Sequence, residues 1–218
     1  MITSSHSAIR SDLAVLPVEK WGWVIYRCTY ADNTAWTRFR DRVEAISRES
    51  IAESDAPEIA DRLEWTWVED PVTLDGASTA ALRERFRAWA ADEVARQPGD
   101  YDPVAIPRFN FFVKVDEEAL QSVAGAAPPG MPWPRDSFVK FVDASWESSP
   151  VNAGEGQGQE YDDSEPEIFE PIDGCIEEDV GWIRISPFMI RTDFYDVWCG
   201  VSDLWNVWYE RPPKIVYY

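Results

Sequence analysis

The sequence predicts one α+β domain with a ferredoxin-like two-layer architecture, a mostly antiparallel sheet that carries two amphipathic helices on one face. Three observations predict it. Segments of strand and helix character follow one another as strand, helix, strand, short strand, helix, strand. Two later stretches, residues 111–116 and 138–143, repeat an aromatic and β-branched pattern typical of central strands. The 218 residues are 45% hydrophobic, which is enough for a single core.

The first strand and the first helix have the clearest patterns. Residues 21–30 are mostly aromatic and β-branched, and strand alternation places Tyr26 on one side and Trp23 and Arg27 on the other. Asp32 is a candidate N-cap for the helix that follows and ends near residue 51. The apolar stripe of this helix recurs at helical spacing and consists of Trp36, Phe39, Val43 and Ile46.

The next segments complete the predicted order. Residues 63–68 form a second strand, which ends at the turn signal Glu69-Asp70-Pro71. Residues 72–74 are then predicted as a short return strand. Ser78 lies in the capping region of the second helix, which extends to about residue 96 and ends before a Pro-Gly pair.

The two central strands each carry a lysine. Lys114 lies in a strand that ends at Val115, and Lys140 lies in the strand over residues 137–146. An acidic short helix, residues 116–123, and a proline-rich linker, residues 125–134, are expected between them. A lysine within an apolar strand must reach solvent, find a partner or face a cavity. These two lysines are therefore the first candidates for a function.

The two ends of the chain and one acidic segment surround the predicted core. Residues 1–20, which include His6, are expected to form a frayed N-terminal tail before the core at residues 21–148. Residues 150–180 hold eleven acidic residues and no basic one, which predicts a solvated loop, with a lid or a docking arm as alternatives. Residues 181–218 continue as a strand and an aromatic segment, which we expect to bury itself against the open face of the sheet.

Composition excludes several classes of protein. The net charge is −20, which disfavours binding to nucleic acid or to an anionic membrane surface. One histidine is too few for a multi-histidine metal centre, and its place in the tail argues against a Ser-His-Asp or Cys-His site. Three widely spaced cysteines suit free thiols in a reducing compartment. With no secretory signal and no membrane-spanning run, we expect a cytoplasmic protein that needs no metal and no cofactor.

The candidate site lies on the sheet face that the two helices leave open. Four residues there are candidate catalytic groups, because they can act as acid, base or nucleophile: Lys114, Lys140, Glu64 and Asp143. Six further residues are expected to bind substrate as cations, hydrogen-bonding groups or aromatic walls: Arg27, Asn110, Phe112, Arg184, Trp198 and Trp205. A solvated face, on which long side chains only shield the sheet, is the structural alternative.

Two functions compete on these observations. The cations and the aromatic segment indicate a cofactor-independent enzyme of lyase, isomerase or cyclase type, which acts on an anionic or carbonyl-bearing small molecule. The net charge and residues 150–180 indicate instead an acidic module that binds a basic protein or forms a homodimer, without catalysis. A purely structural role is a third alternative. A cavity that contains Lys114 or Lys140 favours the ligand, and a flat or filled face favours the partner.

One family resemblance accompanies these patterns. Residues 21–30, the helix that begins at Asp32-Asn33-Thr34, and residues 72–76 together resemble a family of intracellular proteins from filamentous fungi that has no assigned chemistry. The resemblance covers most of the chain. It implies an intracellular α+β protein and transfers no activity and no site residue.

Overall fold

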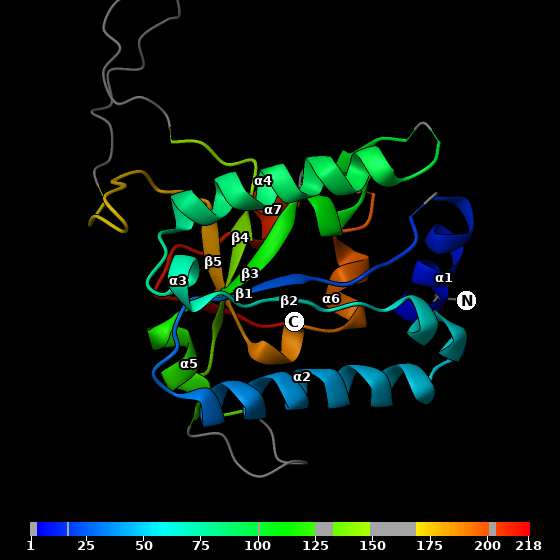
Figure 1. The fold of residues 1–218 in the computed structure, drawn as a ribbon, viewed down its shortest axis with the longest axis horizontal. Coiled ribbons are helices and arrows are strands. Elements are labelled where there is room, and N and C mark those ends of the chain that lie inside the picture. The colour runs from blue at the N-terminus through cyan, green and yellow to red at the C-terminus, as the bar shows by residue number, and fades with distance from the viewer. Residues whose placement is uncertain (1–3, 17, 100, 125–132, 149–168, 201–203) are drawn as a thin grey trace, which may run out of the picture.

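The protein forms a six-stranded mixed sheet with helices on both faces (Figure 1). The computed structural model describes residues 4–16, 18–99, 101–124, 133–148, 169–200 and 204–218. The order of the strands is β2 (Thr66–Val68), β1 (Val24–Arg27), β3 (Phe111–Val115), β4 (Val139–Asp143), β5 (Trp182–Ile185) and β6 (Ile215–Val216). The pairs β2–β1, β1–β3 and β5–β6 are parallel, and β3–β4 and β4–β5 are antiparallel.

The two long helices lie on opposite faces of this sheet (Figure 1). They are α2 (Asn33–Ala52) and α4 (Thr79–Arg96). The shorter α5 (Glu117–Ala124) and α6 (Thr192–Val197) both contact α2. The remaining α-helices are α1 (Ser5–Val15), α3 (Pro71–Leu74) and α7 (Trp205–Trp208). Short 3-10 segments within the described ranges connect these elements: η1 (Pro57–Arg62), η2 (Pro103–Ala105), η3 (Pro107–Phe109) and η4 (Pro187–Met189).

The predicted ferredoxin-like sandwich is wrong, and the error starts at residues 72–74. These residues were predicted as a return strand, but they belong to the helical turn α3. Pro71 occupies the first turn of α3, where its missing N–H costs nothing, and the Asp70 side chain accepts a hydrogen bond from the Val72 amide at 3.1 Å. The chain therefore does not return as an antiparallel strand after β2.

The absence of that return strand decides where α4 lies. The chain goes from β1 through α2 to β2, then from β2 through α4 to β3, on the other side of β1. Right-handed crossovers made in opposite directions place their helices on opposite faces of a sheet. Consequently α4 covers the face that the sandwich prediction left open. The strand β1 is buried along its whole length.

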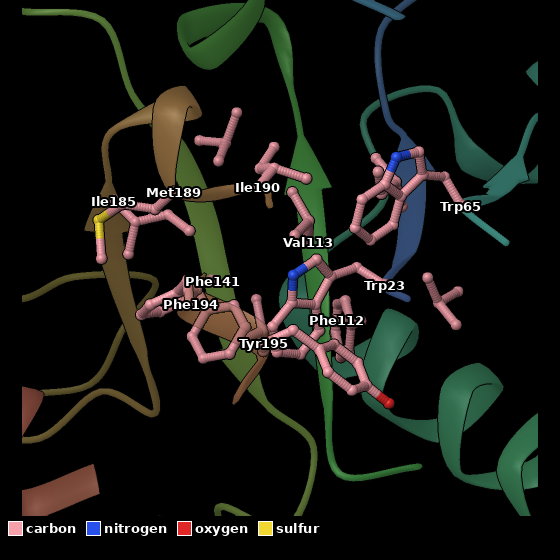
Figure 2. Close-up of a cluster of buried hydrophobic side chains, with 14 of the residues drawn as sticks. Trp23, Trp65, Phe112, Val113, Phe141, Ile185, Met189, Ile190, Phe194 and Tyr195 are labelled. Carbon is pink, nitrogen blue, oxygen red and sulfur yellow. The ribbon is translucent and has the colours of Figure 1, made fainter. Parts of the chain in front are cut away.

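The aromatic C-terminal segment was expected to cover an open face, but it fills the core on the α2 side of the sheet. Trp23 of β1 packs against Phe141 at 5.1 Å and against Tyr195 at 4.9 Å between ring centroids. Figure 2 shows these rings together with Phe194 in one buried cluster. Trp198 is 1% exposed and packs on the same rings. This face is a buried aromatic core.

Most of the other predicted elements are confirmed with shifted ends. Asp32 caps α2 and Ser78 caps α4, each through its side chain. Residues 5–15 form α1, which buries Ile9 and Leu13, so most of the N-terminus is a docked helix and not a frayed tail. Most of the acidic segment and of the proline-rich linker, residues 149–168 and 125–132, lies outside the described residues. No helix in the described part of the chain is long and apolar enough to cross a membrane.

Candidate functional site: a groove at the carboxyl ends of β1 and β3

A groove of about 660 Å³ lies where the chain leaves two parallel neighbouring strands, β1 and β3. From β1 the chain turns toward β2, and from β3 it turns toward β4, on opposite sides. Ligands of open α/β sheets bind at such reversals, outside the carboxyl ends of the strands. Four parts of the chain line the groove: residues 28–31, residues 75–77, Lys114 and residues 116–118.

Local hydrogen bonds hold the walls of the groove in place. The Gly76 amide donates to the Cys28 carbonyl at 3.1 Å, which ties the loop before α4 to the end of β1. Gly76 has φ +66°, a left-handed conformation that glycine adopts without steric cost. Across the groove, the Thr29 hydroxyl donates to the Glu117 carboxylate at the start of α5. The loops after β1 and β3 are therefore fixed to each other.

Three cations form one row across the sheet beside the groove. Lys114 of β3 is the direct partner of Lys140 in β4, and Lys140 is the direct partner of Arg184 in β5. Directly paired residues project from the same face of a sheet, here the face that α4 covers. Lys114 is 6% exposed and Lys140 is 8% exposed. Like charges this close repel each other, so the row needs nearby carboxylates.

Asp116 and Glu118 supply these carboxylates. An Asp116 oxygen lies 2.7 Å from the Lys140 Nζ and 3.7 Å from the Lys114 Nζ. Glu118 lies 2.6 Å from the Arg184 Nη2 and 3.7 Å from the Lys140 Nζ. Burial alone would raise the pKa of Asp116, but the hydrogen bond from Lys140 and the charges of both lysines outweigh it and hold the pKa below its ordinary value. Asp116 is thus an ionised structural partner and a poor proton acceptor.

Lys114 and Lys140 are held very differently. Lys140 is fixed by its short contact with Asp116, and its Nζ lies 4.6 Å from the ring centroid of Trp182. Lys114 donates one hydrogen bond, at 3.3 Å, to the Thr79 hydroxyl, and its carboxylate partner is at the longer distance of 3.7 Å. Of the two lysines, Lys114 lines the groove. Its ammonium group is the cation best placed to contact a ligand.

Cys28 also lines the groove, but its thiol is not prepared for nucleophilic attack. Burial raises the pKa of Cys28 to about 12, with the nearby charge of Lys114 opposing that rise. A cysteine reacts as the thiolate, so a raised pKa keeps the sulfur protonated and unreactive near neutral pH. Cys28 is therefore a wall of the groove.

Both predicted catalytic carboxylates lie away from the lysine pair. Glu64 precedes β2 at the opposite end of the sheet, where it contacts the Arg108 guanidinium at 2.7 Å. Asp143 pairs with Phe111 at the start of β3 and accepts hydrogen bonds from the Ser145 amide and hydroxyl, each at 2.7 Å. Burial raises the pKa of Asp143, and these hydrogen bonds oppose the rise only in part. The structure does not bring either carboxylate to the groove.

Two of the predicted binding residues organise the backbone around them. The Arg27 guanidinium donates to the Thr29 carbonyl, contacts Glu69 at 3.2 Å and lies 4.3 Å from the centroid of the Tyr30 ring. The Asn110 amide donates to three carbonyls of residues 103–106, which closes the turn before β3. These contacts account for the polar side chains of Arg27 and Asn110.

The aromatic binding candidates are packed in the interior. Phe112 has no exposed surface and lies between Tyr26 and the Phe86 ring of α4. Trp198 belongs to the aromatic core, and Trp205 stacks against the same core while its indole N–H donates to Asp179 at 2.7 Å. Only Arg184 among the six predicted binding residues joins the lysine pair.

Several residues of the site were not candidates in the sequence. They are Thr79, Asp116, Glu117 and Glu118. Thr79 begins α4, Asp116 follows β3, and Glu117 and Glu118 begin α5. Their proximity depends on the parallel pairing of β1 with β3, which brings the loops after both strands to one edge. In the predicted antiparallel sandwich, the loops after these two strands would lie at opposite edges of the sheet. In the described part of the chain, no group of three or more His, Cys, Asp or Glu residues could hold a metal ion.

Comparisons with protein-family models, with characterised proteins and with solved structures found no match for this chain. No activity and no site residue is therefore transferred by similarity. The resemblance to a fungal family stays a prediction.

Proposed function

We propose that the protein is an enzyme that acts on a small molecule in the groove at the carboxyl ends of β1 and β3, with Lys114 as its catalytic cation. The observation that supports this most is the loosely held Lys114 ammonium in a groove at a strand-order reversal. A volume of about 660 Å³ is within the range of small-molecule sites. A lysine fixed only for structure would have stronger partners, as Lys140 has.

The chemistry that suits Lys114 is stabilisation of negative charge on an oxygen. A lyase or isomerase that transfers a proton from the carbon beside a carbonyl group to a base, here the Glu117 carboxylate of the lining, develops such charge on the carbonyl oxygen, and a cation held in a partly buried site stabilises it. Asp116 keeps its negative charge and limits the net positive charge of the row. The proposed reaction uses no metal and no cofactor.

The charges of the lining also restrict the ligand. Asp75, Asp116, Glu117 and Glu118 contribute four negative charges to the groove, and Lys114 contributes one positive charge. A ligand with several negative charges would be repelled by this lining. The proposed substrate carries one oxygen acceptor for Lys114 and is neutral or positively charged elsewhere.

The test is turnover of a metabolite pool. The purified protein, a Lys114→Met variant and a Lys214→Met control are incubated with a small-molecule extract that is followed by mass spectrometry. Lys214 is a surface lysine paired with Glu210 at 2.8 Å, so its replacement controls for loss of one lysine charge. We expect one compound to fall and another to rise with the protein and the control, but not with Lys114→Met. Identical profiles for all three proteins would overturn the proposal.

An acidic module that binds a basic protein, or that forms a homodimer, is the second candidate. Its support is the net charge of −20 and the eleven acidic residues at 150–180. Binding of a basic protein partner together with unchanged metabolite profiles would favour this candidate. For either function we propose a cytoplasmic location and no nucleic-acid partner, on the strength of the free cysteines and the net charge.

A further inference from the structure

A hydrogen-bonded chain leads from the groove to a turn that is distant in sequence. The Lys114 Nζ donates to the Thr79 hydroxyl at 3.3 Å, and the Thr79 hydroxyl donates to the Asp173 carboxylate at 3.3 Å. Thr79 is 4% exposed, so the middle of the chain is protected from water. A hydroxyl has one proton to donate. Because the Thr79 hydroxyl directs its proton into the hydrogen bond with Asp173, a lone pair of the Thr79 oxygen faces Lys114.

The backbone at Asp173 has an unusual conformation. Its φ is +51°, the only positive φ of a non-glycine residue in the part of the chain that the structure describes. It is followed by Gly174 at φ +84°, inside a turn closed by backbone hydrogen bonds between Ile172 and Cys175. Positive φ at both central residues is what a two-residue hairpin turn requires, and aspartate followed by glycine is a favoured pair for it. The local sequence therefore fixes the backbone of Asp173.

The surroundings of this turn come from the C-terminal segment. The Arg211 guanidinium donates to the carbonyls of Glu170 at 2.6 Å and Glu178 at 2.8 Å, one on each side of the turn. The Tyr209 hydroxyl bonds to the Glu178 carbonyl and accepts from the Val180 amide at 3.1 Å. Both ends of the turn are therefore fixed, and Asp173 is presented to the N-terminus of α4.

We infer that Asp173 is a positioning residue for Lys114, acting through the Thr79 hydroxyl. This inference rests on the proposed function of the groove, because it assigns the carboxylate that orients the proposed catalytic cation. Without Asp173 the Thr79 hydroxyl is free to turn its proton toward Lys114. Lys114 then loses the Thr79 oxygen as its hydrogen-bond acceptor, and its ammonium group moves toward Asp116. The ligand loses a donor aimed into the groove.

Lysine side-chain NMR tests this inference directly, because the chain has lysine only at positions 20, 114, 140 and 214. In lysine-labelled protein, each ε-methylene signal is assigned from a Lys→Met variant. We expect Thr79→Val and Asp173→Ala each to shift the Lys114 signal and to leave Lys20 and Lys214 unchanged, because each variant removes one member of the chain. Thr37→Val and Asp41→Ala, two exposed positions on α2, are the matched controls and should shift none of the four signals.

The double variant decides whether the effect passes through Thr79. If the chain is the route, Asp173→Ala adds no further shift of Lys114 in the Thr79→Val background. An equal additional shift would show that Asp173 acts directly on Lys114 through space, and no shift in either single variant would show no coupling. Both of these results overturn the inference.

A glycine variant separates positioning from stability. Asp173→Gly removes the carboxylate and relieves the left-handed backbone, so the melting temperature should stay the same or rise while the Lys114 signal shifts as in Asp173→Ala. A lower melting temperature without a shift of Lys114 would assign a structural role to Asp173 and overturn the inference.

Ligand binding gives the functional readout. With 4-aminobutanoate as the probe, which has one carboxylate for Lys114 and one ammonium for the acidic lining, we expect Asp173→Ala to weaken binding roughly 3- to 10-fold, the value of one hydrogen bond. Unchanged affinity in Asp173→Ala would overturn the positioning role and leave the groove as a site. If the probe does not bind the unmodified protein but Lys114 shifts as expected, the proposed ligand class fails and the coupling of Asp173 to Lys114 stands.

Discussion

The two ends of strand β3 each hold a buried cation, and the two are held in contrasting ways. Arg108, just before β3, donates to the Gly22 carbonyl, the Glu64 carbonyl and carboxylate, and the Thr66 hydroxyl at 2.7 to 3.0 Å. Lys114, near the end of β3, donates one hydrogen bond at 3.3 Å. Both residues are buried, at 3% and 6% exposed.

The difference separates a structural cation from a candidate functional one. The hydrogen bonds of Arg108 close the backbone where β1, β2 and β3 begin, so its donors are used within the fold. Among the residues that the structure describes, Lys114 donates a hydrogen bond to Thr79 alone, and it lies on the wall of a groove. Burial of a charge is therefore a weak indicator of function by itself. The number and length of the hydrogen bonds of the buried cation are more informative.

The largest effect is expected at Arg108, the buried cation just before β3. Arg108→Met should lower the free energy of unfolding by about 3 kcal/mol, because two backbone carbonyls lose their charged donor and Glu64 loses its partner. Urea denaturation at neutral pH measures this loss. A loss below about 1 kcal/mol would place Arg108 and Lys114 in the same class and remove the contrast.

A smaller effect is expected at the carboxylate between the two lysines. Asp116→Asn should cost about 2 kcal/mol at neutral pH, because Lys140 loses a charged hydrogen bond. The pKa of Asp116 is below its ordinary value of 3.8 in the folded protein, so its contribution is present above that value and is lost as the pH falls through the folded pKa. Urea denaturation from pH 7 to pH 3 should show the two proteins converging only at the acid end. A difference that grows toward acid pH would contradict this sign.

The two lysines themselves should respond unequally. Lys140→Met should cost about 1 to 2 kcal/mol, because Asp116 loses its short charged partner and keeps the hydrogen bond from the Ala119 amide and the longer contact to Lys114. Lys114→Met should change the free energy of unfolding by about 0 to 1 kcal/mol, neutral or stabilising, because its apolar stem is kept and little hydrogen bonding is lost. The same variant should abolish turnover in the metabolite assay. Equal costs for the two variants would mean that Lys114 is as structural as Lys140.

Sequence patterns predicted the individual elements better than their arrangement. Three of the four predicted stripe residues of α2 are buried, Trp36, Phe39 and Val43, and Ile46 is only half-buried. This stripe, the two helix caps and the two lysine-bearing strands depend on local spacing, which the sequence displays directly. The arrangement depended on four residues, 71–74, where a helical turn replaced a strand and sent α4 to the other face. Local signals for that turn were present in Asp70-Pro71, since aspartate caps helices and proline favours their first turn.

The candidate site was predictable to a similar degree. Lys114, Lys140 and Arg184 were selected because cations in apolar strands need partners, and the structure places them in one row. Glu64 and Asp143 were selected as partners without knowledge of the strand register, and the register places them at the other end of the sheet. Thr79 and Asp116 require knowledge that β1 and β3 are parallel. No local pattern in the sequence contains that information.

The smallest effect is expected at Asp143, the carboxylate at the opposite end of the sheet from Asp116. Asp143 is the counterpart of Asp116, but burial raises the pKa of Asp143, since its two hydrogen bonds from Ser145 do not compensate for lost hydration. A raised folded pKa gives stability that is present at low pH and is lost as the pH rises through the folded pKa, the reverse of Asp116. Asp143→Asn keeps an oxygen that can accept both Ser145 hydrogen bonds and removes the buried charge. This variant should therefore be more stable than the unmodified protein by about 0.5 kcal/mol at pH 7, and the two should be equal near pH 3. Urea denaturation at both pH values measures the difference, and a less stable Asn variant at pH 7 would show that the ionised Asp143 contributes to the fold through the charge of Arg83.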